Sequence, residues 1–299
     1  MQNNVQQSAK DFHTPVLLKE VLDILQPKDG AFYLDATFGA GGYTKAILNA
    51  AKCNVVAIDK DEGAQDFYQL IKNDFDNRLS FYSANFSQIK KIAPRHKKFD
   101  GIVFDIGVST MQLKTASRGF SFANEGPLDM RMSKKITIDA NMIVNSFSQE
   151  QIANIIYNLG GETKSRKIAK AIVDQRKKQE IKTTTQLAKI VHDCFPIRYY
   201  KIDPATKTFQ ALRIFVNQEL EELKKGLDQA ASLIAKDGKI IVVSFHSLED
   251  RIVKHAFRNL KISEQGFEII NKKVITPCKK ELEDNPSSRS AKLRAIKKL

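Results

Sequence analysis

Three glycines lie within four positions of the stretch DATFGAGGYT, residues 35–44, directly after an apolar run. Glycine permits a tight turn and lets the backbone approach a ligand at the start of a helix. Gly39 and Gly41 match the first two positions of the dinucleotide fingerprint G-x-G-x-x-G, but Thr44 stands at the third. No Gly-Lys-Ser/Thr follows, which excludes a P-loop. The spacing indicates a nucleotide-like ligand but does not identify it. The charges of the neighbouring residues distinguish between the candidate ligands.

Aspartates end the first two expected strands. Asp35 stands just before the glycines, where a carboxylate repels a pyrophosphate and attracts a cation. S-adenosyl-L-methionine (SAM) carries an ammonium and a sulfonium and no phosphate, so Asp35 favours SAM over a dinucleotide. Asp59 ends the second strand, where it can accept hydrogen bonds from the ribose hydroxyls of either cofactor. The alternative is a structural turn in which Asp35 caps the following helix.

Two later strands end in groups suited to the same edge of a sheet. Asp105, in FDIGVST, can contact the cofactor or the substrate, or cap the following turn. In SFHSLEDR, Ser247 and Asp250 predict a capping box at a helix start. Phe245 and His246 then face the edge of a cleft, although a single histidine is as often structural as catalytic.

The segment SRGFSFANEGPLDMRM, residues 117–132, interleaves aromatic and basic side chains with glycines. Phe120 and Phe122 are suited to stacking on an unpaired base, and Arg118 and Arg131 to holding phosphate. The alternative is a loop held in place by its own two phenylalanines.

Alternating strands and helices must position these residues. Continuous apolar strands separated by helical segments predict a parallel, doubly wound α/β sheet. A helical insertion, residues 148–236, interrupts the alternation. Its last helix is expected over 206–238, with a kink near Gly226. Thr14 and Pro15 predict the start of the first helix. The expected strands are 31–37, 54–59, 78–83, 99–106, 239–245, 267–276 and a final KLRAIKK.

Composition limits the class of protein. The 299 residues are 42% hydrophobic, enough for a core, and carry a formal net charge of +14. This excess favours a polyanionic partner, nucleic acid first, although lysines on solvated faces would also produce it. Three scattered cysteines without a C-x-x-C pair indicate neither a disulfide framework nor a zinc site, so no metal is expected. The absence of a long apolar run predicts a cytoplasmic protein with no membrane partner, and the polar residues 1–11 are expected to be disordered.

Several segments occur in an order that resembles a known family. They include HTPVLLKEVLDIL, DATFGAGGYT, FDGIVFDIGVST, GPLDMRM, TFQALRIFVNQELEEL, SFHSLEDRIVK and NPSSRSAKLRA. Over about residues 12–295 the chain is similar to the bacterial 16S ribosomal RNA cytosine-N4 methyltransferases. The resemblance implies a class I SAM-dependent methyltransferase: an α/β, Rossmann-like, mostly parallel seven-stranded sheet, residues 12–114 and 210–299, with an inserted all-helical substrate-recognition domain, residues 115–209. It implies methylation of N4 of a decoding-centre cytosine in 16S rRNA.

The resemblance also implies that individual residues contact SAM, with Phe86 packing on its adenine, whereas the catalytic and substrate candidates come from the residue types and their positions. Asp105 is the candidate catalytic acceptor for the N4 protons. Tyr43 stands where the family often has histidine, and whether its ring or only its backbone touches SAM is open. With Asp35 and Gly39 from the loop, the cofactor set is Asp35, Gly39, Gly41, Gly42, Tyr43, Asp59, Phe86, Asp105 and Gln112. The substrate set is Arg118, Phe120, Phe122, Arg131, Phe245, His246 and Arg289.

Other functions remain open at this level. DNA amino-methyltransferases carry an (Asp/Asn)-Pro-Pro-(Tyr/Phe) tetrapeptide, whereas residues 105–108 are Asp-Ile-Gly-Val, which disfavours DNA. A non-catalytic RNA-binding module and methylation of another RNA are further alternatives. Asp35 and Thr44 disfavour an NAD-linked oxidoreductase. Sequence leaves open whether the protein is a monomer or a homodimer, and whether its substrate is free 16S rRNA or the small ribosomal subunit.

Overall fold

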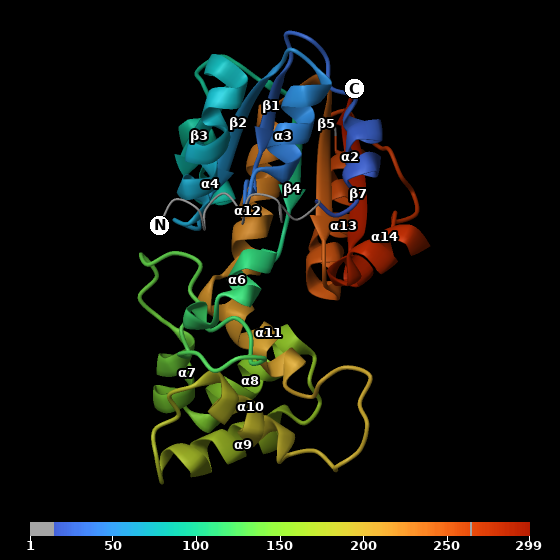
Figure 1. The fold of residues 1–299 in the computed structure, drawn as a ribbon. Coiled ribbons are helices and arrows are strands. Elements are labelled where there is room, and N and C mark those ends of the chain that lie inside the picture. The colour runs from blue at the N-terminus through green and yellow to red at the C-terminus, as the bar shows by residue number, and fades with distance from the viewer. Residues whose placement is uncertain (1–14, 264) are drawn as a thin grey trace. The chain divides into compact units, whose positions relative to one another are not determined.

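The computed structural model describes residues 15–263 and 265–299 (Figure 1). The expected disorder of residues 1–11 and the expected helix cap Thr14 lie outside the described residues. Contacts divide the chain into an α/β unit, up to Gly107 and again from Leu220, and a helical unit, Val108–Glu219. The domain boundaries expected from sequence lay after residues 114 and 209.

The α/β unit contains a seven-stranded sheet with the order β3-β2-β1-β4-β5-β7-β6. The first five strands in this order pair in parallel, and β7 pairs antiparallel with β5 and β6. This confirms the mostly parallel, seven-stranded sheet expected from sequence. The strands are β1 (Phe32–Asp35), β2 (Asn54–Asp59), β3 (Leu79–Ser83), β4 (Phe99–Asp105), β5 (Ile234–Ser244), β6 (Phe267–Ile269) and β7 (Lys292–Lys298).

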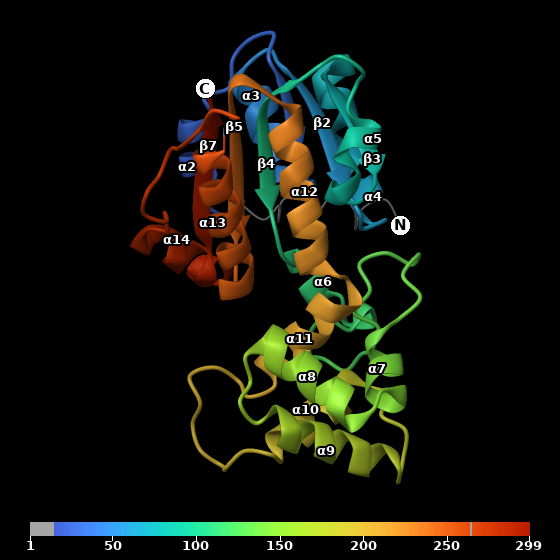
Figure 2. The ribbon, with the colours of Figure 1, turned by 180° about the vertical axis from the view of Figure 1, so that it is seen from behind.

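Helices cover both faces of this sheet. Alternate residues of a strand point to opposite faces, so Tyr33 packs in the cluster that includes α2, α3 and α4, and Leu34 in the one that includes α5, α12 and α13. Figure 1 looks onto the first of these faces and Figure 2 onto the second. The helices of this part are α2 (Leu18–Leu25), α3 (Gly42–Ala50), α4 (Ala64–Ile71), α5 (Ile89–Ile92), α12 (Glu219–Leu233), α13 (Ser247–Ile262) and α14 (Lys279–Asp284).

The helical unit has its own buried apolar cluster. Ser148 and Thr183 cap α8 and α10 in capping boxes, and Gly161, with φ +61°, ends α8. Its helices are α6 (Thr110–Lys114), α7 (Ala140–Ser146), α8 (Gln149–Gly160), α9 (Ser165–Arg176), α10 (Thr184–His192) and α11 (Thr206–Val216). Short 3₁₀ turns occur at Lys72–Arg78, Phe86–Gln88, Ala116–Arg118 and Pro286–Ser290.

Several expected element boundaries are wrong. Pro15 does not begin a helix, because α2 starts at Leu18. The long helix expected over 206–238 breaks at Asn217 and Gln218, not near Gly226. Gln218 has a left-handed φ of +49°, and the Asn217 side chain binds the backbone of Met130 and Met132.

The role of Gly226 and the lengths of two strands also differ from expectation. Gly226 continues α12, where a Cβ would lie 2.8 Å from the Phe86 ring, so it serves close packing. Strand β5 begins earlier than expected, at Ile234, and β6 ends at Ile269. Among the described residues, no helix combines the length and the apolar character needed to cross a membrane.

Candidate functional site

Three aspartates end three neighbouring strands at one edge of the sheet. Asp59 ends β2, Asp35 ends β1 and Asp105 ends β4, and these strands are adjacent in the order β2-β1-β4. The chain leaves β1 toward β2 on one side and later reaches β4 on the other, which makes β1/β4 the topological switch point. Ligands of open α/β sheets bind outside the carboxyl ends of the strands at this point. The structure thus brings together the three carboxylates that the sequence singled out.

The glycines after β1 serve two purposes. Gly39, with φ +53°, has no atom within 4 Å of a Cβ built on it, so its surface is open to a ligand. Gly41 has φ +80°, and its Cβ would lie 2.8 Å from the Ile71 side chain. A Cβ on Gly42 would lie 2.3 Å from Pro15. Gly41 and Gly42 therefore permit close packing at the start of α3, while Gly39 leaves the open surface.

Asp35 is completely buried and bonded within the loop. Its carboxylate accepts hydrogen bonds from Thr44 Oγ1 at 2.7 Å and from the Thr37 backbone N–H at 3.1 Å. Burial raises its pKa to about 6, although the bonds from Thr44 and Thr37 oppose this shift. Asp35 therefore ties the strand end to the first turn of α3, which is the structural alternative that the sequence left open. A direct contact with a cofactor stays a prediction.

Asp59 fixes the other side of the glycine loop. One carboxylate oxygen accepts the Gly39 N–H at 2.7 Å, and the other accepts the Asp61 N–H at 2.8 Å. Burial raises the pKa of Asp59, and these two bonds oppose the shift. Each carboxylate oxygen can accept a second hydrogen bond. The predicted bonds to ribose hydroxyls are therefore compatible with the loop, and they stay a prediction.

Asp105 differs from the other two carboxylates. Its Oδ1 is buried and has no hydrogen-bond partner among the described residues. Its backbone N–H donates to Thr37 Oγ1 at 2.6 Å, which fixes the end of β4 to the end of β1. Burial, and to a smaller extent the negative charges of Asp35 and Glu249, together raise its pKa to about 8. A buried acceptor without a partner is costly, so this oxygen marks a place where a ligand donor or cation would be stabilised.

Tyr43 and Phe86 are mainly enclosed by protein. The Tyr43 ring is 3% exposed, and its hydroxyl donates to the carbonyl of Val16. Burial raises the Tyr43 pKa well above its ordinary value. Phe86 follows β3 and lies in the apolar cluster that includes α5, α12 and α13. Its ring meets that of Phe104 edge-on, at 5.9 Å between centroids. Stacking of Phe86 on an adenine stays a prediction.

The start of α13 corrects the sequence-based cap. His246, not Ser247, is the N-cap: its Nδ1 accepts the Glu249 N–H, and Glu249 accepts the N–H groups of Phe245 at 2.9 Å and His246 at 3.2 Å. The predicted pairing of Ser247 with Asp250 is wrong, because Asp250 instead binds the guanidinium of Arg294.

His246 is therefore held by the helix start. Its Nε2 lies 2.9 Å from Glu249 Oε1, although the two atoms are not aligned for a hydrogen bond. Phe245 is half-buried, and a Cβ on Gly107 would lie 3.4 Å from its ring. Phe245 thus lies beside the backbone that follows Asp105. Roles of Phe245 and His246 toward a substrate stay predictions.

In the helical unit, the expected site residues contact their own unit. Gln112 is buried, and its side chain accepts the Ser109 N–H in the capping box of α6. Arg118 donates to the Arg131 and Met132 carbonyls at 3.1 and 3.3 Å. Arg131 binds Asp129 through two nitrogens, and this ion pair lowers the Asp129 pKa despite burial.

The two phenylalanines of the same loop face inward. Phe120 is 6% exposed in the apolar cluster, and the Phe122 ring lies 4.8 Å from that of Phe209. These contacts are the ones expected of a loop held by its own aromatics. Arg289, in the 3₁₀ turn Pro286–Ser290 near the C-terminus, is exposed. Substrate roles for all of these residues stay predictions.

Three residues of the site were missed by sequence reasoning. Thr37 and Thr44 hold Asp35, and Thr37 also holds the Asp105 backbone. Glu249 completes the α13 cap and is buried. The signal for Glu249 was present, because it stands three positions after His246, as a capping box requires. Nothing in the local pattern links Thr37 to a strand 68 positions away.

Comparison with known proteins agrees with this architecture. Residues 10–299 match the MraW methylase family. A protein of Ehrlichia chaffeensis, named ribosomal RNA small subunit methyltransferase H, is 59% identical over 296 residues, which cover 96% of this chain and 100% of that protein. A protein of Neorickettsia sennetsu with the same name is 56% identical over 287 residues and covers 96% of each chain. The chain therefore belongs to the MraW methylase family, and its sheet is that of a class I, Rossmann-like methyltransferase.

Proposed function

We propose that this protein uses SAM to methylate 16S rRNA of the small ribosomal subunit, at N4 of a decoding-centre cytosine. The names of its full-length relatives support the class of substrate. The observation that carries the proposal is the buried Oδ1 of Asp105 at the carboxyl end of β4, which has no hydrogen-bond partner within residues 15–263 and 265–299. Such an oxygen would stabilise the positive charge of a methyl donor, and it would accept a hydrogen bond from an amine that loses a proton.

The residues at the sheet edge fit SAM. Gly39 offers an open backbone surface, Asp59 has acceptor capacity for ribose hydroxyls, and Asp105 has an acceptor oxygen that no other described residue bonds. Tyr43 would contribute its backbone N–H at the first turn of α3, because its hydroxyl is bonded to Val16. When bound, SAM supplies an electrophilic methyl group on a sulfonium.

Asp105 would accept a proton from the target amine. The N4 lone pair of cytosine is delocalised into the ring, so the amine becomes basic only as it pyramidalises. A carboxylate that accepts an N4 hydrogen favours this change and receives the proton after attack. With a pKa of about 8, Asp105 is largely protonated at neutral pH, and a nearby positive charge would ionise it. Holding the amine in line contributes about 7–11 kcal/mol in well-oriented reactions.

The target base must leave its stack to reach this edge. Phe245 is half-buried beside Gly107, which stands two positions after Asp105, and we propose that it contacts the base. Arg118 and Arg131 donate hydrogen bonds to carbonyls of their own loop, and a phosphate contact by either residue stays a proposal. Since its substrate would be ribosomal, we place the protein in the cytoplasm.

Labelling of small subunits tests this function. Subunits from a strain that lacks the enzyme would be incubated with SAM tritiated on its methyl group, and the labelled nucleotide would be mapped. We expect one N4-methylated cytosine, and absence of label with the wild-type protein would contradict the function. Asp105→Asn should lower the rate at least about 100-fold, whereas the exposed control Asp74→Asn should not. Normal turnover by Asp105→Asn would remove Asp105 from the mechanism.

A further inference from the structure

The segment between α10 and α11 exposes large apolar side chains. Ile197 is fully exposed, Tyr199 is 89% exposed and Ile202 is 54% exposed. Single exposed apolar residues are ordinary, but three within six positions form a patch, and such patches on soluble proteins are commonly interaction sites. We refer to residues 195–203 as the aromatic loop.

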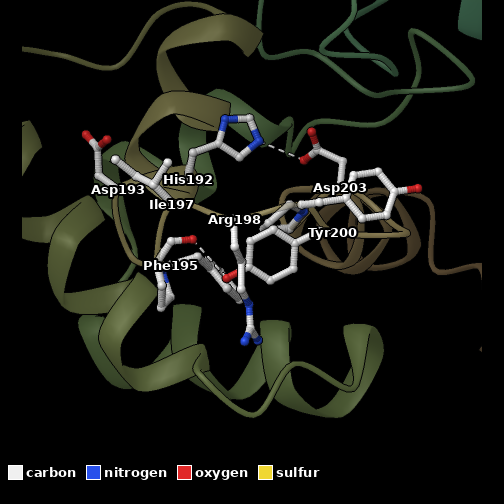
Figure 3. A pocket seen from close by; sticks show the side chains of 10 residues that line it. His192, Asp193, Phe195, Ile197, Arg198, Tyr200 and Asp203 are labelled. Atoms are coloured by element: carbon white, nitrogen blue, oxygen red, sulfur yellow. Dashed lines mark hydrogen bonds and ion pairs between the residues drawn. The ribbon is translucent and has the colours of Figure 1, made fainter.

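The aromatic loop is held by specific contacts. The Tyr200 hydroxyl donates to the Pro196 carbonyl at 3.0 Å, and the Tyr200 ring meets Phe195 edge-on at 5.8 Å. At the loop's far end, Asp203 lies 2.7 Å from His192 and accepts the Ala205 N–H. The loop borders a hollow of about 790 Å³, and Figure 3 shows His192, Asp203 and Tyr200 around it. The patch is therefore built on a defined backbone.

Positive charge surrounds this patch. Arg198 stacks on the Tyr200 ring at 5.0 Å, and Lys201 follows in the same loop. On the neighbouring α9 and the turn before it, Lys164 lies over the Phe195 ring at 4.2 Å, and Lys167 donates to the Cys194 carbonyl. The one acid of the loop, Asp203, is paired with His192, and Asp193 borders the same hollow. An exposed aromatic ring among cations fits a strand of nucleic acid.

We infer that the aromatic loop binds an unpaired nucleotide of the ribosomal RNA, with the base on Tyr199 and the phosphates at Arg198 and Lys201. This inference rests on the proposed function and adds a contact outside the α/β unit. A second copy of the chain fits less well, because a twofold interface here would bring the same cations of two chains, each with a net charge of +14, against one another.

Binding to unmethylated small subunits tests the loop. Removal of one base-stacking aromatic weakens single-stranded binding by about 5- to 150-fold, so Tyr199→Ala should raise the Kd by this factor. Tyr199→Phe should stay within about twofold of wild type, because the ring is kept. The control Tyr157→Ala removes a tyrosine of α8 that is 58% exposed and should leave the Kd unchanged. A circular dichroism spectrum and a Tm that match those of wild type would show that each variant is folded, because SAM affinity reports on the α/β unit and not on the helical unit.

A second pair of variants tests the charges. Arg198→Ala/Lys201→Ala should reduce the slope of log K against log salt by about 1.4 for single-stranded contacts. The control Lys177→Ala/Lys178→Ala removes the same charge at the opposite end of α9, where both lysines are exposed, and should change the slope little.

Three results would overturn the inference. One is an unchanged Kd for Tyr199→Ala. Another is an equal loss of slope in both double variants, which would indicate net charge alone. The third is conversion of a wild-type dimer to a monomer by Tyr199→Ala with unchanged RNA affinity, which would assign the loop to a second copy. Failure of the wild-type protein to methylate or bind the subunit would instead contradict the proposed function, so the two failures are distinguishable.

Discussion

Asp105 combines a firmly held backbone with a buried carboxylate oxygen that has no hydrogen-bond partner in the part of the chain that the structure describes. Thr37 fixes its backbone N–H, while Asp35 and Glu249 add negative charge around its carboxyl group. Stability alone would favour a neutral side chain here. A polar group kept at such a cost is typical of a site arranged for a ligand.

The cost of burying the Asp105 carboxylate predicts a pH-dependent difference in stability between the wild-type protein and Asp105→Asn. The Asp105 pKa is about 8 in the folded protein and about 3.9 in an unfolded chain. The folded state therefore holds a proton that the unfolded state loses, and stability present below about pH 4 is lost as the pH rises to about 8. Asp105→Asn removes this loss. Without SAM, we expect its Tm to exceed that of wild type by several degrees at pH 8 and by less at pH 5, since 1 kcal/mol corresponds to about 2–4 °C.

Scanning calorimetry at pH 5, 6.5 and 8 measures this difference. Addition of SAM should reduce the difference in Tm between the two proteins at pH 8, because only the wild-type carboxylate gains a cationic partner. A difference that is the same at all three pH values would show that Asp105 ionises normally in the folded protein.

The Tyr43 side chain is occupied by contacts within the α/β unit. Its ring is buried between α2 and α3, and its hydroxyl binds the Val16 carbonyl. The side chain is thus a packing element of the α/β unit. A contact of Tyr43 with SAM through its backbone N–H, at the first turn of α3, stays a prediction.

At the scale of elements, the start of α13 shows how a cap can be misread by one residue. Ser247, the more usual capping residue, is exposed, while His246 and Glu249 form the reciprocal box. The extended backbone of His246, two positions after the end of β5, sets the point at which the chain turns into the helix.

This cap predicts unequal effects of two alanine substitutions. Glu249→Ala leaves the N–H groups of Phe245 and His246 without their acceptor, which costs about 1–3 kcal/mol. Ser247→Ala removes no capping bond and should stay within about 0.5 kcal/mol of wild type. Urea unfolding at pH 6 compares the two, because Asp105 is then protonated in both proteins. Equal losses, or a larger loss for Ser247→Ala, would contradict the observed box.

At the scale of the whole molecule, the net charge of +14 does not mean that every basic residue is available to RNA. Near the C-terminus, Arg294 and Lys292 pair with Asp250, and these charges lower the Asp250 pKa. Lys297 pairs with Asp237. These cations stabilise β7, whereas Arg289 is exposed.

The two arginines should therefore respond differently. Arg289→Ala should reduce the salt slope of small-subunit binding by about 0.7–0.9, the value for one phosphate contact, without a change in Tm. Arg294→Ala should lower the Tm, because it leaves Asp250, which is 15% exposed, without its bidentate partner. Salt titrations and thermal unfolding of both variants provide the comparison. Loss of slope for Arg294→Ala with an unchanged Tm would reverse this assignment.

The sequence by itself determined the strands of the sheet, the glycine turn and the three strand-end aspartates. Continuous apolar runs and glycine spacing are local, and parallel strands must end at a common edge, so Asp35, Asp59 and Asp105 could be predicted together. Helices α8 and α10 were also predictable, because the two residues of each capping box lie within four positions of each other in the sequence.

Only the tertiary structure decided which groups pair across that edge. Thr37 reaches Asp105 because β1 lies beside β4, and Arg294 reaches Asp250 because β7 pairs with β5. Such partners depend on strand order and register, which no local periodicity encodes. For the same reason the sequence offered Arg118 and Phe120 as groups for RNA, whereas the folded loop turns both toward its own unit.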